Sequence, residues 1–100
     1  MLKIQTTVEK IVTAKGWKTQ SLEQKYLLLV EEIGELSKDI RKIIGLPIGS
    51  HSQISAVGEE AADVLFVLLA ICNDLKIDIE KELANKFKVI NRRSPDKKWC

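Results

Sequence analysis

The sequence predicts an all-α fold, a bundle of four helices whose core is completed by oligomerisation. Apolar residues recur at helical spacing in four segments, and no segment alternates polar and apolar residues between turn signals, as a half-buried strand would. A chain of 100 residues makes one domain with a thin core, and small helical domains often enlarge their core by association. We therefore expect a single domain over residues 1–100, assembled as a homodimer or homotetramer, in which residues 93–100 are a loose tail.

The first two helices are predicted at about residues 2–15 and 22–44. Gly16 ends the first, Ser21 is a suitable N-cap for the second, and Gly45 with Pro47 ends the second. The apolar stripe of the first helix comprises Ile4, Val8, Ile11 and Val12. That of the second follows the 3.6-residue period and comprises Leu22, Tyr26, Leu29, Val30, Ile33, Leu36, Ile40 and Ile44.

The remaining helices follow a predicted loop over residues 45–52, which contains His51, a residue without an expected catalytic role. The third helix is expected to begin between Ser52 and Gly58 and to end near Leu75. The fourth begins after Asp78, a suitable N-cap, and extends to about Arg92.

The composition favours a globular cytoplasmic protein. Hydrophobic residues make up 45% and charged residues 30%, and the formal charge is +2, so neither nucleic acid nor a membrane surface is indicated as a partner. The most apolar stretch, residues 61–72, is shorter than the roughly 20 residues that span a bilayer. Cys72 and Cys100 are placed as reduced thiols and not as a disulfide scaffold.

The third helix contains one charge in an otherwise apolar stretch. Residues 61–72 are apolar on all sides except at Asp63, so we expect this helix to be the most buried and its carboxylate to need a partner. Glu60 lies three residues earlier, on the same helix face. Acids such as Glu59 and Glu60 are also common in the first turn of a helix, where they complement its dipole, but this does not explain Asp63.

The second helix carries a matching acidic cluster. Glu32 falls at the border of the apolar stripe, Glu35 follows on the same side, and Glu31 and Asp39 lie nearby. Taken alone, this cluster is better explained as a solvated acidic face, balanced by neighbouring basic residues.

The two clusters together point to a metal site. If the two helices are antiparallel neighbours, Glu32, Glu35, Glu60 and Asp63 converge, and carboxylates at that density repel one another unless a divalent cation lies among them. Oxygen ligands of this kind suit Mg²⁺, with Mn²⁺ as a substitute.

The spacing of these acids resembles that of MazG-like nucleoside triphosphate pyrophosphohydrolases. The matching motifs are Glu-Glu-x-x-Glu at residues 31–35 and Glu-x-x-Asp at residues 60–63, with the flanks Leu-Val-Glu-Glu-Ile-Gly-Glu-Leu and Glu-Glu-Ala-Ala-Asp-Val-Leu-Phe. The resemblance covers about residues 20–93, and it departs from the family at Ala62, where glycine is common.

The resemblance implies a specific activity. Such proteins cleave nucleoside triphosphates between the α and β phosphates to a nucleoside monophosphate and pyrophosphate, act as dimers or tetramers, and often remove noncanonical or surplus nucleotides from the pool. Bound Mg²⁺ would neutralise the triphosphate and acidify a water molecule. Either Glu31 or Glu35 would then accept the proton as the catalytic base.

Four further residues are candidates for substrate binding, each with a structural alternative. Trp17 could stack on a base or cover a small core. Asn73 could contact the nucleotide or merely end its helix. Lys86 and Arg93 could bind phosphate oxygens, although basic residues at the C-terminal end of a helix are common without that role.

Three other functions are weaker interpretations of the sequence. A di-iron carboxylate bundle requires Glu-x-x-His pairs, whereas the one histidine, His51, is outside any predicted helix. A nucleic-acid binder acting through Lys97, Lys98 and Trp99 has little support from so short a tail. A non-catalytic helical interaction module is the main alternative to the enzyme, and the complete set of carboxylates argues against it.

Overall fold

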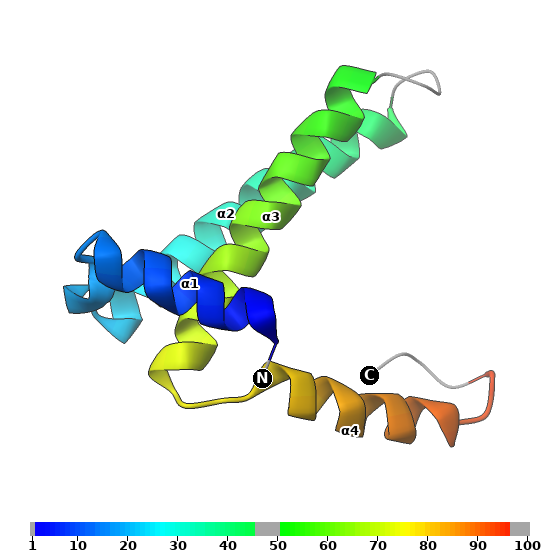
Figure 1. Ribbon diagram of the computed structural model, residues 1–100. Coiled ribbons are helices and arrows are strands. Elements are labelled where there is room, and N and C mark those ends of the chain that lie inside the picture. The colour runs from blue at the N-terminus through cyan, green and yellow to red at the C-terminus, as the bar shows by residue number, and fades with distance from the viewer. Residues whose placement is uncertain (1, 46–50, 97–100) are drawn as a thin grey trace.

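The computed structural model describes residues 2–45 and 51–96, and of His51 and Ser52 only the backbone. Four α-helices follow one another along the chain, with a short 3-10 helix between the first two (Figure 1). They are α1 Lys3–Ala14, η1 Trp17–Thr19, α2 Leu22–Ile44, α3 His51–Asp74 and α4 Ile79–Asn91. The described residues contain no strand, so the prediction of an all-α chain with four helices is confirmed.

One additional helix and one helix boundary differ from the predictions. The short helix η1 was not predicted, and it follows Gly16, a glycine with a left-handed φ of 73°. The helix α3 begins at His51, before the expected start between Ser52 and Gly58, so His51 is helical. No glycine or proline lies between His51 and Gly58, and nothing in that segment stops the helix from extending back. The rest of the predicted loop falls on residues 46–50, outside the described residues.

The long helices α2 and α3 lie side by side and antiparallel, and α1 crosses α3 near its C-terminal end (Figure 1). The core lies at this crossing, where Val8 and Val12 of α1 meet Leu69 and Ala70 of α3. Phe66 and Ile79 pack against the same cluster. Most of the buried apolar residues belong to α3, as predicted: among the described residues these are Val67, Leu69, Ala70 and Cys72.

A buried glutamine joins α1 to the turn between α3 and α4. Gln5 is completely buried, and its Nε2 atom donates a hydrogen bond of 2.6 Å to the carbonyl oxygen of Ile77. The Oε1 atom of Gln5 accepts a hydrogen bond of 3.3 Å from the backbone N–H of Ile79. The backbone carbonyl oxygen of Gln5 accepts a hydrogen bond of 3.0 Å from Asn73 Nδ2. This network fixes the direction in which the chain leaves α3.

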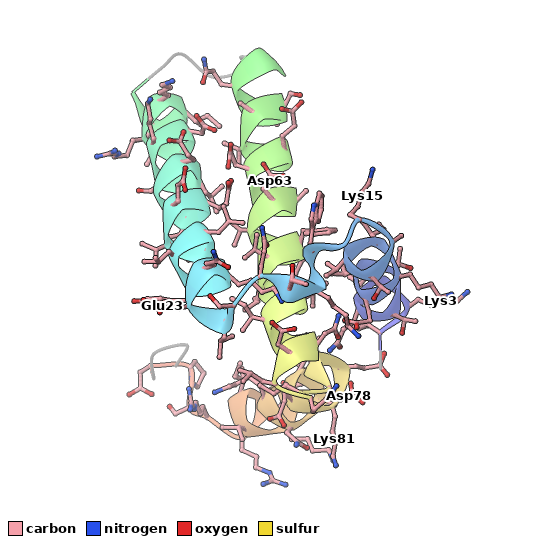
Figure 2. The ribbon with its side chains drawn as sticks, turned by 90° about the vertical axis from the view of Figure 1, so that its left-hand side faces the viewer. Lys3, Lys15, Glu23, Asp63, Asp78 and Lys81 are labelled. Carbon is pink, nitrogen blue, oxygen red and sulfur yellow. The ribbon has the colours of Figure 1, made fainter. Side chains whose placement is uncertain are left out.

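The helix α4 points away from the other helices and meets them closely only near its first turn (Figures 1 and 2). Asp78 is its N-cap, as predicted, and accepts a hydrogen bond from the backbone N–H of Lys81. Of the tail predicted to be loose, residues 97–100 lie outside the described residues, whereas Ser94 donates a hydrogen bond to Asp96.

The apolar stripe predicted for α2 is wrong for the single chain. Only Leu29 and Leu36 of that stripe are half-buried, and the exposed members are Leu22, Tyr26, Val30, Ile33, Ile40 and Ile44. The reason is that α2 has one helical neighbour, α3, while α4 lies elsewhere. The residue of α2 that is buried is Lys25.

Two smaller burial predictions are also wrong. In α1, Ile4 and Ile11 are exposed, and Gln5 is buried with Val8 and Val12. Asp63 is exposed, although its neighbours in the sequence are apolar. Within the described residues, no helix combines the length and the apolar character needed to cross a membrane.

Candidate functional site

The site is built on the antiparallel pair of α2 and α3. A capping box sets the start of α2: Ser21 Oγ accepts a hydrogen bond of 3.1 Å from the Gln24 N–H, and Gln24 Oε1 accepts one of 2.8 Å from the Ser21 N–H. Because the two helices run in opposite directions, acids in the middle of each come together.

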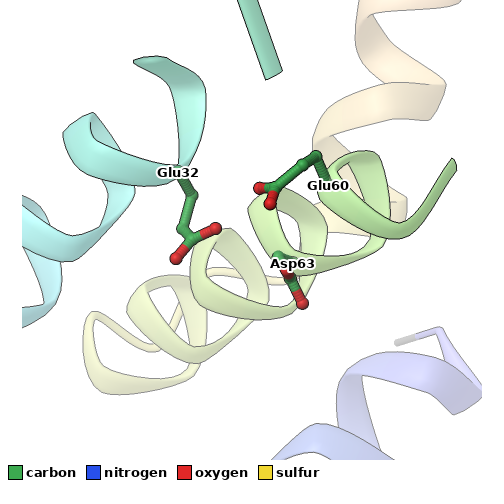
Figure 3. A group of neighbouring side chains, drawn as sticks. All are labelled: Glu32, Glu60 and Asp63. Carbon is green, nitrogen blue, oxygen red and sulfur yellow. The ribbon is translucent and has the colours of Figure 1, made fainter. Parts of the chain in front are cut away.

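Three of the four predicted metal ligands meet between these helices. Glu32 extends from α2 toward Glu60 on α3, and Asp63 lies one turn further along α3 (Figure 3). One carboxylate oxygen from each lies within 4.8 Å of the other two. Glu32 and Glu60 are half-buried, whereas Asp63 is exposed.

Crowding of negative charge is strongest at Glu60. Its pKa rises from 4.5 to about 7, first because of a hydrogen bond with the Glu32 side chain, then because of desolvation, and then because of the negative charges of Glu32, Asp63 and Asp39. The Oε2 atom of Glu60 is buried and has no hydrogen-bond partner among the described residues. An acceptor left in that state is energetically unfavourable, and a cation would satisfy it.

The structure leaves Glu35 and Glu31 outside this group of three. Both are exposed side chains of α2, and neither joins the carboxylates that lie within 4.8 Å of one another. Glu35 follows Glu32 by three residues and so shares its helix face. Its role as a fourth ligand, and that of Glu31 or Glu35 as catalytic base, stay predictions.

A pocket of about 330 Å³ adjoins the acidic group. Glu32 and Asp63 are among the residues that line it, and so is Trp17 of η1, which the sequence suggested as a substrate-binding residue. The other lining residues are Val12, Gln20, Lys25, Leu28, Phe66, Val67 and Ala70. The pocket is therefore mainly apolar, with polar side chains at a few points, as is usual for sites that bind small molecules.

The other three substrate-binding candidates lie elsewhere. Asn73 donates its hydrogen bond to the Gln5 carbonyl and lines a second pocket, with Thr6, Glu9 and Lys76. Lys86 is exposed on α4, and Arg93 follows the end of that helix. None of the described residues of α4 lines the first pocket.

Sequence reasoning missed Lys25, which lines the pocket and is only 4% exposed. Its ammonium group forms an ion pair with Asp74 Oδ2, at the C-terminal end of α3. A signal was present, because Lys25 lies on the face between Leu22 and Leu29 and seven residues before Glu32. A lysine on an apolar face usually extends its ammonium group to solvent, so Lys25 did not stand out. The sequence alone does not indicate its ion pair with Asp74.

Comparison with known proteins agrees with this geometry. The family model described as the MazG nucleotide pyrophosphohydrolase domain matches residues 20–97. The uncharacterized protein YpjD of Bacillus subtilis (strain 168) is 33% identical over 70 residues, which cover 69% of this chain and 63% of that protein. The chain thus matches less than two thirds of the length of this relative. No solved structure matches the chain.

Proposed function

We propose that this chain, which belongs to the MazG nucleotide pyrophosphohydrolase family, hydrolyses nucleoside triphosphates between the α and β phosphates. The products are a nucleoside monophosphate and pyrophosphate, and the reaction depends on Mg²⁺, for which Mn²⁺ can substitute. The observation that supports this most directly is the meeting of Glu32, Glu60 and Asp63 beside a pocket.

The residues present fit a hard divalent cation. Three carboxylate oxygens from two helices lie within 4.8 Å of one another, and the buried Oε2 atom of Glu60 has no partner among the described residues. Magnesium and manganese prefer such oxygen ligands. Glu32, Glu60 and Asp63 would hold the ion, with Glu35 as a further ligand. When bound, the ion neutralises phosphate charge and makes water more acidic.

The chain's own side chains then orient the nucleotide and move a proton. The apolar walls of the pocket, including Trp17 and Phe66, enclose the nucleoside while its phosphates face Glu32 and Asp63. Glu31 or Glu35 takes the proton from the attacking water. Substitution of Glu31 and of Glu35, one at a time, distinguishes a catalytic base from a metal ligand. Loss of the base lowers turnover at unchanged Mg²⁺ affinity, whereas loss of a ligand weakens Mg²⁺ binding as well.

Assembly and cellular role belong to the same proposal. We place the chain in a homodimer or homotetramer in the cytoplasm, where it removes unwanted nucleotides from the pool. The exposed apolar side chains of α2 and α4, such as Val30, Ile33 and Phe87, support assembly because a second subunit would cover them. Lys86 and Arg93 would then contact phosphate across the subunit interface.

The test is pyrophosphate release from a panel of nucleoside triphosphates in Mg²⁺, with the nucleotide product identified. We expect monophosphate and pyrophosphate in equal amounts, no turnover with a chelator, and none with Glu32→Gln. Glu59→Gln, which changes an exposed acid next to the site, is the matched control and should stay active. Diphosphate and inorganic phosphate as products, or no turnover of any nucleotide, would favour a non-catalytic module or a different reaction.

A further inference from the structure

A row of exposed side chains on α2 follows the spacing of a long helix pair. Its residues recur at alternating intervals of four and three, the 3.5-residue repeat of helices that pack side by side over many turns. We call this row the outer seam, and its members are Tyr26, Val30, Ile33, Ser37, Ile40 and Ile44. All of them except Ser37 are apolar, and these apolar members are between 41% and 78% exposed.

The same helix carries a second row with the same spacing, one position earlier, and this row is covered. Its members are all buried or half-buried: Lys25, Leu29, Glu32, Leu36, Asp39 and Ile43. The helix that packs along α2 is α3. One residue turns an α-helix by about 100°, so the two rows face different neighbours. The pattern of α2 is therefore that of a helix between two others, of which the described part of the single chain provides one.

The helix that would cover the outer seam has to be long. From Tyr26 to Ile44 the seam extends over about 27 Å, at 1.5 Å per residue. The helix α4 has 13 residues, or about 20 Å, so α4 of another copy would leave part of the seam exposed. The helix α2 has 23 residues and carries the same seam itself. A second α2 thus matches the seam in both length and pattern.

The exposed charges of α2 set the direction of such a partner. The exposed charged residues are acidic in the first part of the helix and basic in the second: Glu23, Glu31 and Glu35, then Lys38, Arg41 and Lys42. A parallel copy would place acids beside acids and bases beside bases, whereas an antiparallel copy places acids beside bases. This division also suits the dipole of α2 itself, but the dipole does not account for the exposed apolar seam beside it.

We propose that α2 packs along its outer seam against α2 of a second copy, antiparallel, about a two-fold axis near residue 35. The seam is self-complementary in this register, as a two-fold interface requires. The opposed residues are Tyr26 and the partner's Ile44, Val30 and the partner's Ile40, and Ile33 and the partner's Ser37. This inference deepens the assembly part of the proposed function and does not depend on the reaction.

The first test changes the one polar residue of the seam in both directions and measures self-association by sedimentation. Ser37→Leu completes the apolar seam, so we expect the Kd of self-association to fall about 10-fold or more. Ser37→Asp places a charge against the partner's Ile33, and the Kd should rise by a similar factor. Because Ser37 is exposed in the single chain, both variants should keep the wild-type helix content by circular dichroism. Ser55→Leu and Ser55→Asp, at an exposed serine of α3, are the matched controls and should associate as the wild type does.

The second test determines the direction of the partner by cross-linking, in the background Cys100→Ser. Cys72 is buried and stays in place. Gly34→Cys lies close to the axis, and a Cβ at this position has nothing within 4 Å in the single chain, so the substitution fits the fold. We expect a short bis-maleimide to join two copies of Gly34→Cys. In Glu23→Cys the two thiols would lie about 36 Å apart along the helices and should not be joined, whereas in a parallel pair they would be adjacent.

The outcomes separate this inference from the proposed reaction. A wild-type protein that sediments at 11.3 kDa at micromolar concentration, or association that neither Ser37 variant changes, overturns the interface. Cross-linking of Glu23→Cys overturns the antiparallel direction. Association that is lost in Phe87→Glu but kept in Ser37→Asp assigns the interface to α4 instead. Turnover is measured separately on the same preparations, so a chain that pairs through α2 but hydrolyses no nucleotide contradicts only the proposed reaction.

Discussion

The carboxyl group of Glu60 on α3 faces that of Glu32 on α2, and the hydrogen bond and the repulsion between them raise the pKa of Glu60 to about 7. A proton shared in this way holds the two carboxyl groups together in the metal-free protein. A cation between the same groups would take over that role. The protein is thus expected to exchange a proton for a metal ion at this place.

The first prediction concerns the stability of the metal-free protein as a function of pH. In the unfolded chain Glu60 has its ordinary pKa of 4.5, so between pH 4.5 and about 7 the folded state binds more protons at this residue. Its contribution to stability is therefore full below pH 4.5 and is lost as the pH rises through about 7. We expect the melting temperature in a chelator to show this fall, and Glu60→Gln to lack it.

The control for this pH dependence is Glu59→Gln, at an exposed position next to Glu60. It should keep the wild-type profile of melting temperature against pH. An identical profile for Glu60→Gln and the wild type would assign the pH dependence to other groups.

The second prediction concerns Gln5 and the turn that begins α4. Gln5→Leu puts an apolar side chain of similar size in the buried position and removes the partners of the Ile77 carbonyl and the Ile79 N–H. Because leaving a buried polar group unpaired costs about 1–3 kcal/mol, we expect the free energy of unfolding to fall by that order. Denaturation in urea measures the change. Gln53→Leu, toward the opposite end of α3, is the comparison, and an equal loss there would contradict a specific role for Gln5.

The third prediction concerns assembly through the outer face of α2. Tyr26, Val30 and Ile33 follow helical spacing, and all are about half exposed in the single chain, at 57%, 51% and 48%. We expect the protein to sediment as a species larger than the 11.3 kDa chain, and Ile33→Glu to shift it toward that mass. The control variant Thr13→Glu, at an exposed position of α1, should leave the sedimenting species unchanged. A wild-type protein of 11.3 kDa at micromolar concentration would contradict this prediction.

The helices could be predicted because their signals are local. Ser21 and Asp78 cap the helices that the sequence assigned to them, and Gly16 and Gly45 mark ends. The pairing of Glu32 with Glu60 could be predicted as well, since two acidic helices of matching period are most simply explained by convergence. These features depend on residue spacing within a helix and on the assumption that the second and third helices are antiparallel neighbours.

The burial of individual side chains could not be predicted in the same way. An apolar stripe indicates that a face is suited to burial, but not which neighbour covers it, and α4 does not cover α2. The contact of Lys25 with Asp74 could not be predicted either, because the two are 49 residues apart and their contact depends on the register of α2 against α3. Asp63 was expected to be buried because its neighbours in the sequence are apolar, but it is exposed. The sequence does not indicate which side of α3 another helix covers.

The last prediction concerns Asp63, whose carboxylate lies within 4.8 Å of those of Glu32 and Glu60 but is exposed to solvent. Asp63→Asn keeps the shape of the side chain and removes its charge, so a bound cation loses one ligand charge. We expect Mg²⁺-dependent turnover to fall on the order of 100-fold or more, because metal catalysis supplies several kcal/mol of transition-state stabilisation.

The same substitution should leave the metal-free fold intact. Asp63 contributes repulsion that helps to raise the pKa of Glu60, so its removal relieves the crowding, and the melting temperature in a chelator should be unchanged or higher. In the wild type, Mg²⁺ at about 100 times its Kd should add about 2.7 kcal/mol to the stability, and this increment should shrink in Asp63→Asn because the ion binds less tightly. Glu59→Gln should behave as the wild type in both measurements. Near-normal turnover would exclude a metal-binding role for Asp63, and lost turnover with a much lower metal-free melting temperature would assign it to the fold instead.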